Sequence, residues 1–391
     1  MTIAGALNNS GTVNISDDNT TSPTTATAVS LNNTGTLNLS GSRGGKATLD
    51  LTGGAAPSVL ASTITLAGNS LLEFANGEIN SIAAGGKLVV NGTSFVADAS
   101  DPTHNSALTA LTTVAGEFDL GNGAWVALGG ALAVTGTLNV DGFYNTFGST
   151  LTVGGDLSNS GTVNIGGGNN AGASTVTIAG ALNNSGTVNI SDDNTSLPTV
   201  LTAATLNNTG TLNLGGSRSG VATLDITSAA PSVLAATVTL AGNSLLEFAS
   251  GSIGSIAAGA KLVLGSSTTQ IADASDLTHN SALSGLQSVA GTLSLQGGSA
   301  VGTAGALAVS GSLSLQGSTL TTGGAVTVTG SSASVNIDAS STLTVGGTSF
   351  TQTGGTTTVS GALSAPLIDV AGGKLDEAKS VTGLTTTTTA C

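Results

Sequence analysis

The fold of this chain is decided by a five-residue pattern that occurs four times in succession, as GTLNV at residues 136–140, GTVNI at 161–165, GTVNI at 186–190 and GTLNL at 210–214. The interval between successive glycines is nearly constant. Each glycine is followed by alternating polar and apolar residues, as in a short β-strand with one face buried and the other in solvent. So short a strand cannot bury its apolar face alone, and a unit that recurs at a nearly fixed interval must use its neighbours as the other half of its core. The pattern therefore predicts a solenoid.

The short period continues outside these four copies, and its units recur about every 19–25 residues. This interval predicts an all-β fold, a right-handed parallel β-helix of roughly 17 or 18 coils. In the stretch LTVGGDLSNSGTVNI (151–165), we expect strands to meet at a Gly-Gly corner and at an Asn-Ser-Gly corner, because glycine and asparagine tolerate positive φ. The alternation places six apolar side chains on one inner wall. These are Val163, Ile165, Val188, Ile190, Leu212 and Leu214.

One segment departs from the strand alternation in each half of the chain. Leu108, Leu111 and Val114 are spaced by three positions before Gly116, and the same spacing recurs over residues 283–291. Spacing of three before a strand is typical of solenoid coils in which a short turn takes the place of one wall. We therefore expect such a turn at both positions.

A second, longer period of about 175 residues contains the short one. LNNTGTLNL recurs at 31–39 and 206–214, and AGNSLLEFA recurs at 67–75 and 241–249. We therefore expect one continuous solenoid over 1–391, with a first long repeat over 1–175, a second over 176–350, and the start of a further partial repeat with a polar tail over 351–391. Residues 2–20 are identical to 177–195, which suggests a segment of a longer protein.

The composition excludes several classes of function. With 21 acidic and 7 basic residues and a net charge of −14, the chain lacks the basic stripe of a nucleic-acid-binding protein. We expect no membrane insertion by this segment, because no run of about 18 apolar residues occurs. The only cysteine is Cys391, so no disulfide can form within the chain.

The stretches GDLSNSGTVNI (155–165) and APLIDVAGGKL (365–375) resemble the passenger regions of bacterial autotransporters and related large β-strand-repeat surface adhesins. The resemblance covers nearly the whole chain. It implies an extracellular β-helix that is displayed on, or released from, a Gram-negative outer membrane. The near-absence of cysteine is also similar to such passengers, which cross the outer membrane unfolded.

The two histidines lie in equivalent loops, each within the sequence Ala-Asp-Ala-Ser-Asp-x-Thr-His-Asn. One metal site per long repeat is conceivable there, although the spacing matches no zinc or EF-hand pattern. The bland alternative is a solvated polar loop. The candidate ligands are Asp98, Asp101 and His104 in the first repeat, and Asp273, Asp276 and His279 in the second.

Two further acidic loops are rich in oxygen ligands, as calcium loops are. They contain the pairs Asp17-Asp18 and Asp192-Asp193, but the Gly-Gly-x-Gly-x-Asp nonapeptide of calcium β-rolls is absent. Loops that keep a solenoid soluble would have the same composition. Basic residues that could serve a polysaccharide-active site are scattered as Arg43, Lys46 and Arg218.

These observations favour a structural and adhesive protein over an enzyme. We expect no catalytic activity and no cofactor, because the sequence offers no paired acids with a basic partner. The expected partners are a host or abiotic surface and other copies of the chain, end to end, at the bacterial cell surface. One alternative is an ice- or surface-binding solenoid, suggested by the outward Thr-x-Asn rank. The other is a polysaccharide-active β-helix enzyme.

Overall fold

The computed structural model describes residues 1–17, 21–42, 44–142, 147–167, 172–192, 197–217, 220–377 and 380–384. The chain divides into two compact units, Met1–Asn207 and Asn208–Cys391. Among the described residues both units consist of β-strands, with one short 3₁₀ helix in each. No described helix has the length and apolar character that crossing a membrane requires. Whether the two units form one continuous solenoid stays a prediction.

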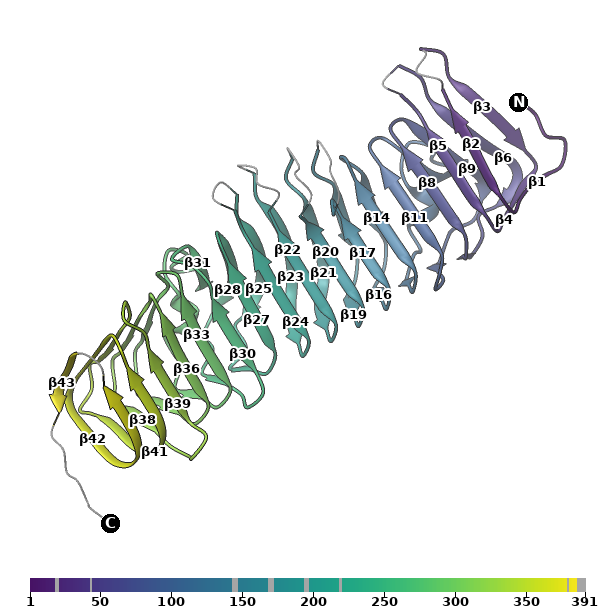
Figure 1. Cartoon of the computed structure of the whole chain (residues 1–391). Coiled ribbons are helices and arrows are strands. Elements are labelled where there is room, and N and C mark those ends of the chain that lie inside the picture. The colour runs from purple at the N-terminus through teal and green to yellow at the C-terminus, as the bar shows by residue number, and fades with distance from the viewer. Residues whose placement is uncertain are drawn as a thin grey trace. The chain divides into compact units, whose positions relative to one another are not determined.

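The strands of the first unit lie on three walls (Figure 1). The GTxNx wall contains β2 (Thr12–Ser16), β5 (Thr36–Ser40), β8 (Thr63–Ala67), β11 (Lys87–Asn91), β14 (Glu117–Gly121), β17 (Thr137–Val140), β20 (Thr162–Gly166) and β22 (Thr187–Ser191). The loop wall contains β3 (Thr24–Ala28), β6 (Ala47–Ala55), β9 (Ser70–Asn76), β12 (Phe95–Asp98), β15 (Trp125–Leu128), β18 (Thr150–Val153) and the first half of β21 (Thr175–Asn184). The short-strand wall contains β1 (Ala6–Asn9), β4 (Ser30–Asn33), β7 (Val59–Leu60), β10 (Ser81–Ile82), β13 (Thr113–Val114), β16 (Leu132–Val134), β19 (Leu157–Asn159) and the second half of β21, and β23 (Thr199–Asn208) ends the unit.

The second unit has the same three walls. Its GTxNx wall contains β24 (Thr211–Gly215), β27 (Thr237–Ala241), β30 (Lys261–Leu264), β33 (Thr292–Gln296), β36 (Ser312–Gln316) and β39 (Ser334–Ile337). Its loop wall contains β25 (Ala222–Ala229), β28 (Ser244–Ser250), β31 (Thr269–Asp273), β34 (Ala300–Thr303), β37 (Thr319–Thr322) and β40 (Thr342–Val345). Its short-strand wall contains β26 (Val233–Leu234), β29 (Ser255–Ile256), β32 (Ser288–Val289), β35 (Leu307–Val309) and β38 (Val326–Val328). The last strands are β41 (Phe350–Val359), β42 (Ala362–Glu377) and β43 (Ser380–Leu384).

Strands on one wall pair in parallel with the corresponding strand of the next coil. On the GTxNx wall, Thr137 of β17 pairs with Thr162 of β20, and Thr162 pairs with Thr187 of β22. The predicted parallel β-helix is therefore confirmed. It has about 14 turns, fewer than the 17 or 18 predicted.

The coil count is lower because some coils are longer than the short period of the sequence predicts. The longest coils contain a 3₁₀ helix, η1 (Ser106–Leu108) in the first unit and η2 (Ser281–Leu283) in the second. Lys87 consequently pairs with Glu117, a longer step along the chain than the step from Thr137 to Thr162. The helix and its flanking loop are inserted between β12 and β13, after the coil has already placed β12 on the loop wall. The short turn thus occurs at the predicted position, but the prediction that it replaces one wall was wrong, because all three walls of this coil have a strand.

The inner faces of the walls form an aliphatic core. All six residues predicted for the inner wall are buried, each no more than 1% exposed. Deleting or charging such a side chain disturbs both neighbouring coils, because each one packs against its counterparts above and below.

The glycines that open β20 and β22 are required for a reason that the sequence did not reveal. A Cβ on Gly161 would lie 2.1 Å from the carbonyl oxygen of Gly136, and one on Gly186 would lie 2.2 Å from that of Gly161. These glycines do not have positive φ. The corners were thus predicted at the right positions but for the wrong reason: glycine is needed because successive coils approach closely, with no room for a side chain.

We predict that Val188→Asp lowers the free energy of unfolding by about 3–5 kcal/mol, because it buries an unpaired carboxylate. Thr187→Asp, on the outward face of the same strand, is the matched control and should cost no more than about 1 kcal/mol. Chemical denaturation followed by circular dichroism measures both variants. Equal stability of the two variants would contradict the inward position of Val188.

Candidate functional site

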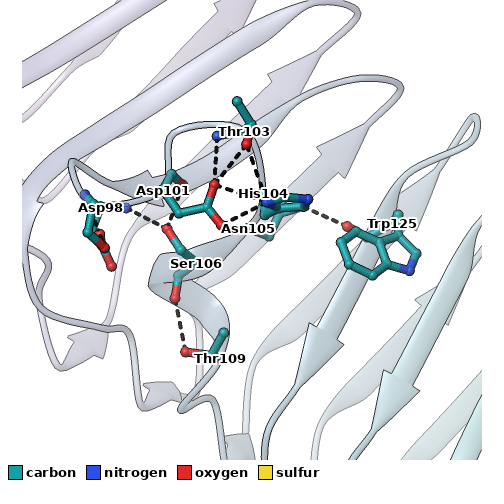
Figure 2. Close-up of polar contacts among 9 residues, drawn as sticks. Asp98, Asp101, Thr103, His104, Asn105, Ser106, Thr109 and Trp125 are labelled. Carbon is teal, nitrogen blue, oxygen red and sulfur yellow. Dashed lines mark hydrogen bonds and ion pairs between the residues drawn. The ribbon is translucent and has the colours of Figure 1, made fainter.

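The loop between β12 and β13 brings together the histidine and one of the two aspartates predicted for the first repeat (Figure 2). The imidazole Nδ1 of His104 lies 2.7 Å from Oδ2 of Asp101. The Thr103 hydroxyl donates to Oδ1 of the same carboxylate at 2.8 Å. The hydrogen bond from the Thr103 hydroxyl has the largest effect on the Asp101 carboxylate, followed by the contact with His104, and both hold its pKa below the usual value. The three side chains form a compact, solvent-accessible polar cluster.

Asp98 does not join this cluster. Its carboxylate accepts a hydrogen bond from the backbone N–H of Ser100 at 2.7 Å and another from the Ser100 hydroxyl. Its own N–H donates to Oγ of Ser106 at 2.9 Å. Within the part of the chain that the structure describes, no group of three or more His, Cys, Asp or Glu side chains is arranged to hold a metal ion.

The second repeat has the same arrangement. Nδ1 of His279 lies 2.8 Å from Oδ2 of Asp276, and the N–H of Ser275 donates to Asp273 at 2.9 Å. Hydrogen bonds from Thr278 and His279 lower the pKa of Asp276 to about 2. The Ser275 hydroxyl and N–H lower the pKa of Asp273. Each aspartate therefore orders its own short turn.

Two of the other predicted acidic positions lie within the described residues. Asp17 and Asp192 are buried, and Asp17 accepts a hydrogen bond from the N–H of Ser42 at 2.8 Å. Asp17 thus ties its loop to the neighbouring coil. The remaining predicted positions Asp18, Asp193, Arg43, Arg218 and Cys391 lie outside the described residues.

Asn105 is a structural residue of this site that the sequence did not identify. Its Oδ1 accepts from the N–H of Val96 on β12 at 2.8 Å, and its Nδ2 donates to the carbonyl of Trp125 on β15 at 2.8 Å (Figure 2). The buried amide side chain therefore bridges β12 and β15, which do not pair with each other directly. Asn280 makes the same two bonds, to Ile271 and Ala300, both at 2.8 Å. The repeat of Asn directly after His was the available signal.

Trp125, at the start of β15, lies beside the polar cluster. The ring centroids of His104 and Trp125 are 5.5 Å apart, with an edge-to-face angle of 70°. In the second repeat the position of Trp125 is occupied by Ala300, and the side chain of His279 is 78% exposed, compared with 53% for His104. The indole therefore covers one side of the imidazole in the first repeat only.

The outer face of the GTxNx wall has an ordered polar surface. The Asn189 amide donates to Asn164 at 2.8 Å, Asn164 donates to Asn139 at 2.8 Å, and Asn139 donates to Asp119 at 2.6 Å. Lys87 ends this ladder with ion pairs to Asp119 at 2.9 Å and Glu117 at 3.0 Å. Burial lowers the pKa of Lys87, but its bonds to these two carboxylates outweigh burial and raise it.

Paired carboxylates, which the sequence analysis did not find, occur on the loop wall of both units. Asp50 pairs in register with Glu73, and Asp225 with Glu247. Partial burial, together with repulsion from the neighbouring aspartate, raises the pKa of each glutamate, and Lys46 acts against this at Glu73. The two acids of each pair are distant in the sequence and lie side by side only through the register of adjacent coils.

No protein-family model, no curated protein and no solved structure matches this chain. The site must therefore be interpreted from its own geometry, which consists of a hydrogen-bonded loop in two copies, one tryptophan, and an ordered polar ladder.

We predict that Asn105→Leu lowers the free energy of unfolding by about 1–3 kcal/mol, because it leaves the buried N–H of Val96 and the carbonyl of Trp125 without their partner. Asn280→Leu should have a similar effect in the second repeat. Denaturation of both variants, with the exposed Thr103→Ala as control, measures this. An Asn105→Leu protein as stable as the control would show that the bridge contributes nothing.

The contribution of the Asp276 carboxylate to the stability of the second-repeat loop should change with pH at strongly acidic values. The pKa of Asp276 is lowered from 3.8 to about 2, so its stabilising contribution is complete above pH 3.8 and is lost as the pH falls towards 2. Carboxyl ¹³C NMR should show Asp276 titrating near pH 2. In Thr278→Val the midpoint should rise, whereas an unchanged midpoint would exclude the hydroxyl as the main cause.

Proposed function

We propose that the chain is a structural and adhesive segment of a bacterial cell-surface or secreted protein, which presents the outer faces of its coils to a host or abiotic surface. The carrying observation is the register of the GTxNx wall. Thr137, Thr162 and Thr187 occupy one line along this wall, and Asn139, Asn164 and Asn189 occupy the next. A repeating surface can bind through many weak, equivalent contacts, whose summed strength exceeds that of any single contact.

The hydrogen bonds within the ladder support this proposal. The Asn164 amide donates one N–H to Asn139 and accepts one hydrogen bond from Asn189. An amide has two N–H groups and two acceptor lone pairs, so the ladder occupies only half of this capacity. Because the side chains are already ordered by their neighbours, a partner that binds them loses little conformational entropy. The Asn164 side chain is thus both ordered and able to form further bonds.

The separation of core and surface also supports a presenting role. Val163 and Val188 maintain the coil from inside, whereas the outward residues of the same strands contact mainly their own counterparts. Outward residues can therefore change without loss of the core. We also propose end-to-end contact between copies, because a coil of parallel strands offers backbone donors and acceptors along the direction of stacking.

Two alternatives are each favoured by one observation. The in-register threonines favour an ice- or surface-binding solenoid, in which the rank itself contacts an ordered lattice. The Asp50–Glu73 pair beside Lys46 favours a polysaccharide-active enzyme, since one carboxyl has a raised pKa, as a general acid requires. The second unit repeats the acid pair as Asp225 and Glu247 with Val221 in place of Lys46, which weakens the enzymatic alternative.

Adhesion of oriented protein tests the proposal. The single thiol of Cys391 allows coupling to beads in one orientation. Retention of the beads under shear on epithelial cells, mucin, glass and polystyrene should exceed that of uncoated beads on at least one surface. Replacing the threonines of the rank, in the triple variant T137V/T162V/T187V, should reduce retention at least tenfold, because valine keeps the strand but removes the hydroxyls.

The matched control removes hydroxyls from the loop wall instead, in T152V/T177V, at two threonines that pair in register on β18 and β21, and it is compared with T162V/T187V from the rank. The control should adhere like the parent protein. Equal losses in both double variants, or retention no better than that of uncoated beads on every surface, would contradict the proposal. Inhibition of ice recrystallisation that the rank variant abolishes would support the ice-binding alternative in its place.

A further inference from the structure

Trp125 is distinguished by its surroundings rather than by exposure alone. It is the only tryptophan in the chain, and it is 46% exposed. It begins β15 with an outward side chain, between His104 on one side and Thr150, its partner on β18, on the other. A single exposed apolar residue is ordinary on a protein surface. An indole between two sets of hydrogen-bonding side chains can instead pack against an apolar ligand face while polar groups on both sides bind the edges of the ligand.

The second repeat shows that the fold does not need this indole. Ala300 occupies the equivalent position, and its carbonyl still accepts the amide of Asn280 at 2.8 Å, the same length as the bond from Asn105 to Trp125. The aspartate–histidine contact is also maintained. Trp125 therefore adds exposed aromatic surface to a loop that is complete without it.

The polar groups around Trp125 lie on both sides of the indole. Asp101, Thr103 and His104 form the hydrogen-bonded cluster on one side. Thr150 lies on the other side, and it is followed in register by Thr175 on the next coil. Together they offer carboxylate oxygens, an imidazole nitrogen and rotatable hydroxyls, which can accept and donate hydrogen bonds.

We propose that Trp125 is the platform of a saccharide-binding site, with Asp101, His104 and Thr150 as its polar contacts. A pyranose ring has an apolar C–H face surrounded by hydroxyl groups. The C–H face can pack on the indole through dispersion, while the hydroxyls reach the polar side chains on both sides. Ala300 leaves the second repeat without the platform, so the site exists in the first repeat only.

A neutral sugar fits this site better than a cation, the other common ligand of an exposed indole. The carboxylate of the cluster, that of Asp101, already contacts Nδ1 of His104 and the Thr103 hydroxyl. Its oxygens are therefore already engaged within the cluster and are less available to a cation. The site lies on the loop wall, whereas the polar ladder lies on the GTxNx wall, so this inference does not depend on the proposed adhesive function.

Intrinsic fluorescence tests the proposal directly, because all tryptophan emission comes from Trp125. Titration with cellobiose, maltose and N,N′-diacetylchitobiose should give a saturable change with at least one sugar, with a dissociation constant on the order of 1 mM, typical of a shallow site. Sorbitol has hydroxyls but no pyranose ring and serves as control. A response to sorbitol equal to that of every sugar, or saturation by choline but by no sugar, would overturn the proposal.

Variants provide the second readout, measured by saturation-transfer NMR on the sugar protons. Trp125→Ala should abolish transfer, and Thr150→Val should weaken binding at least threefold. Ala300→Trp should create a second site of similar selectivity in the second repeat and raise the stoichiometry from one to two. Transfer that persists in folded Trp125→Ala would overturn the proposal. Failure of Ala300→Trp to bind, with its melting curve unchanged, would also overturn it, since the second repeat retains the polar cluster as Asp276, Thr278 and His279.

Discussion

The structure depends on one constraint: each coil lies on the next in parallel register, so a side chain meets its own counterpart at the spacing of adjacent strands, about 4.8 Å. Every position must therefore be compatible with a copy of itself. Leucine and valine satisfy this condition inside through dispersion and burial. Asparagine satisfies it outside, because its amide is both donor and acceptor, as the ladder Asn139, Asn164 and Asn189 shows.

The same constraint explains where charge is tolerated. Asp119 lies in the line of the asparagines and Glu117 in the line of the threonines, but Lys87 on the preceding coil contacts both carboxylates. The acid pair Asp50 and Glu73 has like charges in neighbouring coils, and partial burial and the repulsion between them raise the pKa of Glu73. Because only 7% of the residues are charged, few coils place like charges next to one another.

Much of the fold could be predicted because periodicity carries it. The alternation of apolar residues identified Val163 and Val188 as core, and spacing of three identified the turn at Leu108. The role of Gly161 could not be predicted, because it depends on the carbonyl oxygen of Gly136 in the preceding coil, which a Cβ on Gly161 would approach to 2.1 Å and which no local pattern encodes. The coil number was overestimated for a related reason: the sequence did not show how much of the chain the loops around η1 use.

The candidate site was predicted less well because it depends on contacts between coils. Asp98 and Asp101 are close in sequence, yet each carboxylate orders its own turn through neighbouring serine or threonine hydroxyls. Trp125, which does contact His104, comes much later in the sequence, on the next coil. Local spacing therefore identified one partner of His104, the Asp101 carboxylate, whereas the contact with Trp125 depends on the stacking of one coil on the next.

The two long repeats amount to a comparison of sequences on one scaffold. Positions that bridge or fill the coil are kept, as Asn105 and Asn280 are, because their loss would leave buried backbone groups unpaired. Positions that point outward differ, as Trp125 and Ala300 do, although the backbone around them makes the same hydrogen bonds. Since the inner contacts alone maintain the coil, selection can act on one outward residue without altering the fold. A duplicated solenoid can in this way acquire a binding site in one repeat and leave the other unchanged.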